Sequence, residues 1–369
     1  MKILVTGAKG FVGKNLIATL EQMNDIEIYQ YDVDTDPALL NTYTKDCEFV
    51  FHLAGVNRPQ KEEEFKTGNA GFTNSLLNSL KENKNNCPVL ITSSIQAAMD
   101  NPYGRSKKEA EDLLFDYSKA TGSKVLVYRL PNVFGKWCRP NYNSGVVTFC
   151  HNIAHDRPIK VNDPDVILNL VYIDDVVEEM IRALHGNETR EGDFCKVPVV
   201  HTIRLGDIVK LIYSFKNSRS DLSIPDMEDD FTKKLYATYL SYLPEDQFSY
   251  PLKMNVDNRG SFTEFIRTTE RGQVSINISK PGITKGNHWH HTKNEKFLVV
   301  SGRGVIRFRK VGSDEIIEYH VSGDKLEVVD IPTGYTHNIE NLGDTDMVTI
   351  MWANECFDPE KPDTYYLEV

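Results

Sequence analysis

Apolar and polar residues follow two different periods along the chain. Up to about residue 130, short apolar runs alternate with stretches in which apolar residues return every three or four positions. Such runs are typical of buried parallel strands, and such stretches of amphipathic helices. The runs cover residues 2–6, 27–31, 49–55, 89–94 and 125–130. This alternation predicts βαβ units and an α/β Rossmann-like fold with a doubly wound parallel sheet.

From residue 251 onward the helical period stops, and short strands separated by glycines replace it. Predicted strands cover residues 262–267, 274–278, 297–300, 305–309, 316–320, 326–329 and 347–352. Short strands with such punctuation are typical of an all-β jelly roll or barrel. Residues 216–250 contain serines, an acidic run and a proline break, as a domain junction does. We therefore expect an α/β domain over residues 1–245 and an all-β domain over residues 251–369.

Charge and composition exclude several classes of partner. The 369 residues carry a formal net charge of −11 without a basic block, which argues against nucleic acid and anionic membranes as partners. The apolar runs are too short to insert into a membrane. The six cysteines are scattered without a CxxC pair, and the chain starts on a strand rather than on a signal sequence. We expect reduced thiols and a cytoplasmic location.

A glycine-rich turn joins the first strand to the first helix. It reads Gly7-Ala8-Lys9-Gly10-Phe11-Val12-Gly13. Backbone N–H groups and the positive end of the helix dipole at such a turn suit a pyrophosphate. The second strand leads to Asp32, where an acid typically meets the adenosine ribose of a dinucleotide. A glycine turn that binds nothing is the alternative, but its place between a strand and a helix favours a dinucleotide site.

A tyrosine and a lysine lie four residues apart on a later predicted helix. Tyr103 and Lys107 fall on one helix face, one turn apart. A phenol has an unperturbed pKa near 10, and we expect a nearby ammonium to lower that pKa toward neutral pH. A hydroxyl at the end of a neighbouring strand, such as Ser94, can hold a substrate carbonyl oxygen beside the phenol. Because Tyr-x-x-x-Lys is also common in ordinary helices, the other motifs decide the interpretation.

Taken in order, these motifs resemble the extended short-chain dehydrogenase/reductase family of nucleotide-sugar enzymes. Three further segments carry the resemblance: His52-Leu53-Ala54-Gly55, Asn69-x-x-x-Thr73 and Arg129-Leu130-Pro131-Asn132-Val133-Phe134-Gly135. It implies that Ser94 and Tyr103 bind and protonate a carbonyl oxygen and that Lys107 holds the nicotinamide ribose. The implied cofactor residues are Gly7, Lys9, Gly10, Phe11, Val12, Gly13, Asp32, Leu53, Ala54, Gly55, Tyr103 and Lys107.

The same resemblance implies a sugar-nucleotide pocket lined by Asn132, Arg139 and Asn141. The chain departs from the family at one place. Only residues 95–102 separate Ser94 from Tyr103, and the customary Tyr-Gly after the serine is missing. This short connection leaves Thr92 and Ser93 as alternatives to Ser94.

The all-β part contains four residues that can bind one divalent cation. His288 and His290 lie two apart, so on a strand both point to one face, and Glu295 and His337 can complete the set. An isolated His-x-His is more often incidental. Here the ordered patterns are Gly282-x5-His288-x-His290-x4-Glu295-x6-Gly302 and Pro332-x-Gly334-x2-His337-x3-Asn341.

Those patterns resemble the two motifs of a metal-binding cupin, over about residues 255–352. The resemblance implies that His288, His290, Glu295 and His337 are metal ligands, and the alternative is a set of structural remnants without a metal. Residues 257–264 also resemble the entry strand of nucleotide-deoxysugar 3,5-epimerases, which are cupins too. The proton-abstracting base stays open, with His291, Lys293 and Tyr335 near the metal motif.

The two-domain arrangement resembles bifunctional enzymes of capsular polysaccharide biosynthesis. The likeness implies that the cupin epimerises C3 of a UDP-2-acetamido-2,6-dideoxy-4-hexulose and that the reductase then reduces C4 with NADPH. The product would lead to UDP-N-acetyl-L-fucosamine. The likeness also implies Zn²⁺ and a homodimer. Asp32 argues for NAD and Lys9 for NADPH, so we expect a modest preference for NADPH, with NADH still used.

Two other functions remain open. In one, the first domain is a nucleotide-sugar 4-epimerase or dehydratase with the cupin as a sensor. Dehydration is disfavoured because Ile95 and Gln96, rather than an acid, follow Ser94. In the other, the first domain is a reductase or 4-epimerase, and the cupin is a binding and dimerisation module without catalytic activity.

Overall fold

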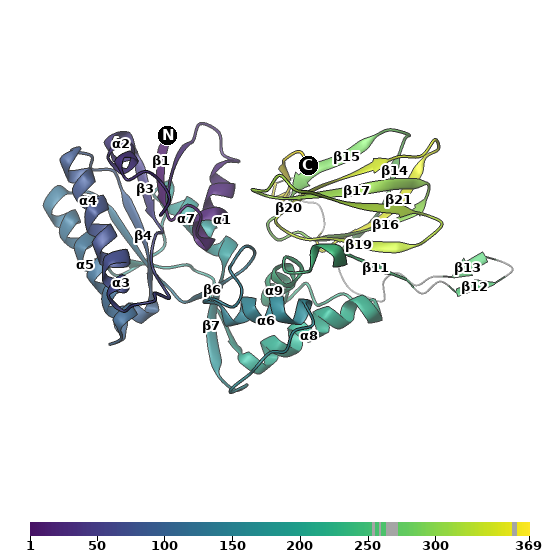
Figure 1. Ribbon diagram of the computed structural model, residues 1–369, viewed down its shortest axis with the longest axis horizontal. Helices are drawn as coiled ribbons and strands as arrows, with labels where there is room; N and C mark the ends of the chain where they lie inside the picture. The colour runs from purple at the N-terminus through teal and green to yellow at the C-terminus, as the bar shows by residue number, and fades with distance from the viewer. Residues whose placement is uncertain (253–254, 258–259, 263–271, 356–359) are drawn as a thin grey trace. The chain divides into compact units, whose positions relative to one another are not determined.

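The computed structural model describes residues 1–252, 255–257, 260–262, 272–355 and 360–369 (Figure 1). The chain divides into two units, of which the first contains residues 1–144 and 168–202 and the second residues 145–167 and 203–369. The domain extents of 1–245 and 251–369 stay predictions, and the second unit groups the helices within residues 145–167 and 203–240 with the β-sheets that follow.

The first unit contains a seven-stranded sheet in the order β2-β1-β3-β4-β5-β9-β8, which is parallel except for the β8–β9 pair. Its strands are β1 (Lys2–Thr6), β2 (Glu27–Tyr31), β3 (Phe49–His52), β4 (Val89–Ser94), β5 (Val125–Leu130), β8 (Arg190–Glu191) and β9 (Phe194–Cys195). The five predicted apolar runs are therefore confirmed as strands. The order reverses at β1, where open α/β sheets bind their ligands.

Helices cover both faces of this sheet. Figure 1 shows α2, α4 and α5 on one face and α1 and α7 on the other. Their bounds are α1 (Phe11–Leu20), α2 (Ala38–Asp46), α3 (Glu63–Lys66), α4 (Phe72–Glu82), α5 (Pro102–Thr121) and α7 (Ile173–Leu184). Leu76 and Leu80 of α4 and Leu114 of α5 are fully buried in the core with Val50 and Val89 of the strands. This apolar packing fixes the strand ends that carry the candidate residues.

Two short helices and a small three-stranded sheet complete this part of the fold. A π-helix, η1 (Thr67–Gly71), precedes α4, and a 3-10 helix, η2 (Ile95–Ala98), makes the short connection from β4 to α5. A separate small sheet has the order β10-β7-β6. Its strands are β6 (Asn132–Phe134), β7 (Ile167–Tyr172) and β10 (His201–Arg204).

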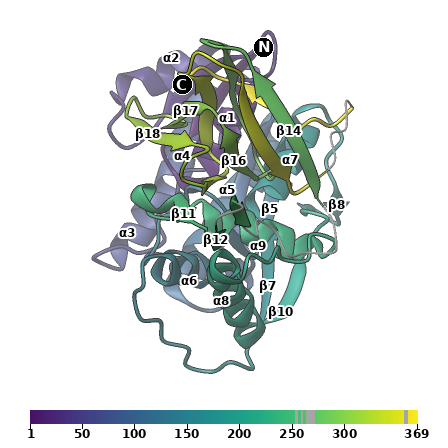
Figure 2. The ribbon, with the colours of Figure 1, turned by 90° about the vertical axis from the view of Figure 1, so that its right-hand side faces the viewer.

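The second unit contains two five-stranded sheets that stack as a sandwich of jelly-roll type (Figures 1 and 2). One is β11-β19-β16-β21-β14, with β11 (Ser249–Pro251), β14 (Gln273–Ser279), β16 (Glu295–Ser301), β19 (Glu327–Ile331) and β21 (Met347–Ala353). The other is β18-β17-β20-β15-β22, with β15 (Thr284–Trp289), β17 (Arg303–Lys310), β18 (Ile316–Ser322), β20 (Tyr335–Asn341) and β22 (Tyr365–Tyr366). A hairpin pairs β12 (Asn255–Asp257) with β13 (Gly260–Phe262).

Most of the predicted strands of this unit are confirmed, but β11, β12, β15, β20 and β22 were missed. Six predicted runs coincide with β14, β16, β17, β18, β19 and β21. The run at 262–267 lies almost wholly outside the described residues, as does part of the segment 257–264. Of the missed strands, β15 and β20 carry His288 and His337. They are rich in polar residues, which hid their strand character.

The helices of the second unit are α6 (Gly145–Ala154), α8 (Leu205–Asp221), α9 (Asp230–Leu240) and the 3-10 helix η3 (Glu245–Gln247). Charged side chains connect α8 to the sheet β11-β19-β16-β21-β14 of the same unit. Lys296 Nζ of β16 lies 2.6 Å from Asp330 Oδ1 of β19, and Arg219 Nε of α8 lies 3.6 Å from Asp330 Oδ2. Such pairing makes the burial of these charges tolerable, which is why these helices belong with the sandwich.

No disulfide links the cysteines that the structure describes. Among the described helices, none has the length and hydropathy that crossing a membrane requires.

Candidate functional site

The glycine turn lies between β1 and α1, and each of its three glycines has a structural role. Gly7 has a φ of +69°, and a Cβ there would lie 2.6 Å from Ala54 N of the chain after β3. A Cβ at Gly13 would lie 2.2 Å from Gly7 O, whereas at Gly10 the nearest atom is 3.0 Å away. Gly7 and Gly13 therefore permit close packing, and Gly10 is the N-cap of α1. This division of roles fits a dinucleotide pyrophosphate at the turn.

Asp32 is tied to the glycine turn. Its carboxylate accepts the backbone N–H of Lys9 at 2.7 Å and that of Val33 at 2.8 Å. The Lys9 ammonium forms an exposed ion pair with Asp34. The structure therefore brings Lys9 to the predicted ribose region, but it also gives Lys9 a carboxylate partner that the sequence reasoning missed.

The residues after β3 make room for Lys107. A Cβ on Gly55 would lie 3.0 Å from Lys107 Nζ and 2.9 Å from Asn69 Oδ1. Lys107 is 6% exposed and donates to the backbone oxygen of Thr92 at 3.0 Å. Burial lowers the pKa of Lys107 to about 8, against the charge of Glu111, which raises it. The structure thus gathers Gly55 and Lys107 at one end of the sheet, with Leu53 and Ala54 against the glycine turn.

Ser94 is the hydroxyl that reaches Tyr103, despite the short connection. It ends β4, its hydroxyl accepts the backbone N–H of Gln96 at 3.2 Å, and it lies near enough to the Tyr103 phenol to lower the pKa of that group against the effect of burial. Of the alternatives, the Ser93 hydroxyl donates to Glu111 Oε1 at 2.5 Å, and Thr92 contacts Lys107 through its backbone oxygen rather than its hydroxyl. The predicted pair of Ser94 and Tyr103 is therefore brought together.

The expected pKa of Tyr103 was wrong. Burial raises this pKa to about 12, and the nearby Ser94 hydroxyl offsets only part of the rise. Lys107 lies one turn further along the same helix, but the loss of solvent around the phenol outweighs any effect of its charge. The phenol is consequently protonated at neutral pH.

Sequence reasoning underestimated Asn69, which links the loop after β3 to α5. Asn69 is 2% exposed and donates to Ser106 Oγ at 2.9 Å and to Val56 O at 3.1 Å. Ser106 in turn donates to the backbone oxygen of Tyr103 at 2.7 Å. Asn69 lies in the π-helix η1, and such helices are frequent at functional sites. The signal in the sequence was the motif Asn69-x-x-x-Thr73.

The predicted sugar-nucleotide residues all follow β5. Asn132 opens β6 and is exposed. Arg139 and Asn141 lie in the loop after β6, where the Arg139 guanidinium carbon is 5.2 Å from the centre of the Tyr142 ring. Asn141 adopts a left-handed conformation with a φ of +54°. Their role in substrate binding stays a prediction.

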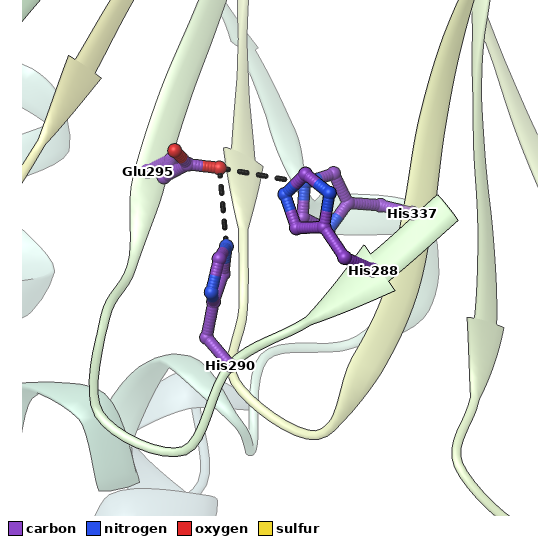
Figure 3. A group of neighbouring side chains, drawn as sticks. All are labelled: His288, His290, Glu295 and His337. Atoms are coloured by element: carbon purple, nitrogen blue, oxygen red, sulfur yellow. Dashed lines mark ion pairs between the residues drawn. The ribbon is translucent and has the colours of Figure 1, made fainter. Parts of the chain in front are cut away.

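The four predicted metal ligands converge inside the sandwich (Figure 3). One ligand atom from each of His288, His290, Glu295 and His337 lies within 4.8 Å of the others. Glu295 Oε2 is 3.4 Å from Nε2 of both His290 and His337. Those three atoms have no hydrogen-bond partner among the described residues, although they are buried. Buried oxygen and nitrogen atoms without a hydrogen-bond partner are suited to coordinate a metal ion.

Electrostatic interactions and burial keep Glu295 ionised and His288 and His337 neutral. Burial tends to raise the pKa of Glu295, but His290 and His337 outweigh it and hold that pKa below its ordinary range. Burial lowers the pKa of His288 to about 3 and also lowers that of His337. A carboxylate and neutral imidazoles are the forms that bind metals. Ligands about 2.1 Å from a tetrahedral Zn²⁺ lie about 3.4 Å apart, which matches the two separations between Glu295 Oε2 and the histidine Nε2 atoms.

Two of the residues considered as a proton base are engaged elsewhere. Lys293 Nζ donates to Pro362 O and Thr364 Oγ1, each at 2.7 Å. The Tyr335 hydroxyl donates to Glu245 Oε1 at 3.1 Å, and burial raises its pKa. The backbone N–H of His291, the third, is bound by Asp363. None of these contacts assigns a base.

Comparisons with known proteins agree with this arrangement. The model of a family described as the NAD dependent epimerase/dehydratase family matches residues 3–195. A second, described as the polysaccharide biosynthesis C-terminal domain, matches residues 255–365. The chain is 45% identical to the UDP-2-acetamido-2,6-beta-L-arabino-hexul-4-ose reductase of Pseudomonas aeruginosa, over 100% of this chain and 99% of that protein.

Solved structures show the same likeness. The crystal structure of the capsular polysaccharide assembling protein CapF from Staphylococcus aureus covers 100% of both chains, with 60% identity and a TM-score of 0.70. The UDP-glucuronic acid 4-epimerase of Bacillus cereus, solved in complex with NAD, covers 59% of this chain and 84% of its own. Its identity is 20% and its TM-score 0.53, so it shows a likeness of fold alone.

Proposed function

The chain belongs to the NAD dependent epimerase/dehydratase family, and from this premise we propose that it is a bifunctional nucleotide-sugar enzyme. In the proposal, the sandwich epimerises C3 of a UDP-2-acetamido-2,6-dideoxy-4-hexulose. The first unit then reduces the C4 ketone with NADPH, toward UDP-N-acetyl-L-fucosamine for capsular polysaccharide. The observation that carries it is the presence of the Ser94–Tyr103 pair and the buried His288, His290, Glu295 and His337 group in one chain.

The full-length relative supports the reductive half. That protein is named a hexul-4-ose reductase, and this chain spans nearly all of it. A UDP-linked keto sugar is accordingly the proposed substrate, with Asn132, Arg139 and Asn141 as its contacts. CapF, the second full-length relative, supports a role in capsule assembly.

Reduction needs a proton donor beside the carbonyl oxygen. When bound, the nicotinamide cofactor supplies a hydride. Ser94 would donate a hydrogen bond to the ketone oxygen, and Tyr103 would deliver the proton as that oxygen gains charge. The raised pKa of Tyr103 keeps the proton on the phenol until then. Lys107 would hold the nicotinamide ribose with its ammonium, which is still charged at pH 7.

Epimerisation needs the loss of a proton from the carbon next to the ketone. Such a C–H bond becomes acidic when negative charge on the ketone oxygen is stabilised. His288, His290, Glu295 and His337 would hold Zn²⁺, and a bound divalent cation supplies Lewis acidity worth several kcal/mol at such an oxygen. His290 and His337 are buried and His288 and Glu295 are partly buried, which strengthens charge interactions there.

A second candidate gives the sandwich no catalytic role. It would then be a binding and dimerisation module for a reductase or 4-epimerase. The observation that favours it is the edge strand β14, on which Val274 and Ile278 are 58% and 54% exposed. Apolar residues on an open strand edge favour association with another copy. A homodimer is compatible with both candidates.

One experiment separates the candidates. The enzyme is incubated with the UDP-linked 4-keto sugar in D₂O, first without and then with NADPH, and the sugar is followed by NMR. We expect deuterium at C3 before NADPH is added and reduction at C4 afterwards. His290→Ala should abolish the exchange. Reduction without any exchange at C3 would reject the epimerase half and leave the dimerisation module as the function of the sandwich.

A further inference from the structure

The loop that contains His290 is held by a residue far away in the sequence. The carboxylate of Asp363 accepts three consecutive backbone N–H groups, from His291 at 2.9 Å, Thr292 at 2.8 Å and Lys293 at 2.6 Å. It also accepts the Thr292 hydroxyl at 3.0 Å. One carboxylate therefore fixes the turn that separates His290 from Glu295.

The same residue also contacts a candidate ligand directly. The backbone oxygen of Asp363 lies 2.5 Å from His290 Nδ1. A carbonyl oxygen can only accept, so Nδ1 must carry the proton. In the neutral imidazole this leaves the lone pair on Nε2, the atom that faces Glu295 at 3.4 Å.

The segment around Asp363 is itself anchored to the site. Lys293 binds Pro362 and Thr364 on either side of it. Strand β22 then pairs with β15, in the register Tyr366 opposite His288 and Tyr365 opposite Trp289. Asp363 has a φ of +37°, which a residue with a side chain adopts when its surroundings impose it.

We propose that Asp363 is a positioning residue for the metal site: its carboxylate holds the His290 loop and thereby keeps its backbone oxygen against His290 Nδ1, which orients the ring. The proposal rests on the proposed metal binding by His288, His290, Glu295 and His337. Partners that hold the second nitrogen of a ligating histidine orient the ring and raise its basicity, and their loss typically weakens metal binding about 10- to 100-fold. Nothing in the ligand spacing indicates Asp363, because it lies outside both cupin-like motifs.

The test compares Asp363→Ala and Asp363→Asn with wild type and with Tyr366→Phe, all as full-length protein. Tyr366→Phe is the matched control, because it removes a hydrogen bond to Glu368 in the same segment without touching the His290 loop. Zn²⁺ affinity is measured by competition with a chelating dye, the Co²⁺ form is examined by visible absorption, and the melting temperature of the metal-stripped protein is recorded.

We expect Asp363→Ala to weaken Zn²⁺ binding about 10- to 100-fold and to change the Co²⁺ spectrum, with Tyr366→Phe like wild type. Asp363→Asn keeps one acceptor oxygen and should fall between them, and it carries the test if the alanine variant does not fold. Wild-type affinity and spectrum in folded variants, with only a lower melting temperature, would overturn the proposal. If wild type itself binds no metal, the proposed metal site fails instead.

Discussion

Tyr103 and Lys107 show how burial sets the chemistry of single side chains. Loss of solvent disfavours the charged form of each, so the pKa of the phenol rises to about 12 and that of the ammonium falls to about 8. Both groups still carry their protons at pH 7. A carbonyl reductase needs a proton donor, and in this environment the Tyr103 phenol keeps its proton at pH 7.

The first prediction concerns Tyr103. Tyr103→Phe removes the proton donor, so carbonyl reduction should fall about 100-fold or more, measured as NADPH oxidation with the keto sugar. Deuterium exchange at C3 should continue. Tyr117→Phe is the matched control, because Tyr117 is a buried tyrosine of the same helix whose hydroxyl donates to Asn85 O. Reduction near the wild-type rate in Tyr103→Phe would remove Tyr103 from the mechanism.

The second prediction concerns the choice of cofactor. Lys9 pairs with Asp34, so a 2′-phosphate must compete with this carboxylate for the ammonium. Asp34→Asn should raise the preference for NADPH over NADH about two- to fivefold, the scale of an exposed ion pair. Lys9→Ala should lower it. The measurement is kcat/KM with each cofactor, with Lys14→Ala of α1 as the control.

Equal weakening of NADPH and NADH by Lys9→Ala would mean that Lys9 only supports the turn. Its backbone N–H already holds Asp32, and that contact survives the substitution. The ion pair with Asp34 could not be predicted from the sequence, because the region after β2 has no regular period. The position of Asp32 could be predicted, because the number of residues between the glycine turn and this acid is characteristic of dinucleotide-binding folds.

At the scale of elements, one histidine joins two strands and a helix. His52 of β3 shares hydrogen bonds with Thr6 of β1 through Nδ1, at 2.7 Å, and with Thr73 of α4 through Nε2, at 2.8 Å. Burial, together with the smaller effect of the Lys107 charge, lowers the pKa of His52 to about 3. The imidazole is therefore neutral in the folded protein across the physiological range.

The third prediction is a pH dependence of stability. Between pH 3 and 6.5 the unfolded chain protonates His52 and the folded protein does not, so stability is full above pH 6.5 and is lost as pH falls toward 3. The slope is about 1.4 kcal/mol per pH unit. His52→Gln should remove this contribution from the pH profile of urea unfolding. His320→Gln, at an exposed histidine, should not; equal slopes in wild type and His52→Gln would contradict the assignment.

Apolar patterns predicted elements well wherever a face is buried in a core. Strands β1–β5 and helix α5 follow directly from such patterns. The π-helix η1 was missed, because it differs from an α-helix in hydrogen bonding rather than in periodicity. Strands β15 and β20 were missed because one of their faces carries the polar candidate ligands in place of apolar residues.

At the scale of the whole molecule, each proposed site lies within one unit. Ser94, Tyr103 and Lys107 belong to the first, and His288, His290, Glu295 and His337 to the second. Spacing predicted the members of both sites, since each motif is local. It could not predict Asp363, which meets the His290 loop only because β22 returns to β15.

The fourth prediction follows from this separation. Tyr103→Phe and His290→Ala should each fail to form the reduced, C3-inverted product alone. A mixture of the two proteins should form it, because the epimerised ketone can leave one protein and enter another. Product analysis by NMR checks this, with each variant alone and each mixed with wild type as controls. No product from the mixture would mean that the intermediate does not exchange between proteins.

The return of the chain to the His290 loop has a consequence for synthesis on the ribosome. Asp363 is made 73 residues after His290, which takes roughly 4 to 15 s at typical elongation rates. Within that interval Glu295 and His337 join His288 and His290, which are already made, while the loop between His290 and Glu295 lacks its anchor. A message that stops short of codon 363 would thus encode every ligand and still yield a loosely organised site. Metal capture by the nascent chain is therefore expected to be weak until codon 363 has been translated.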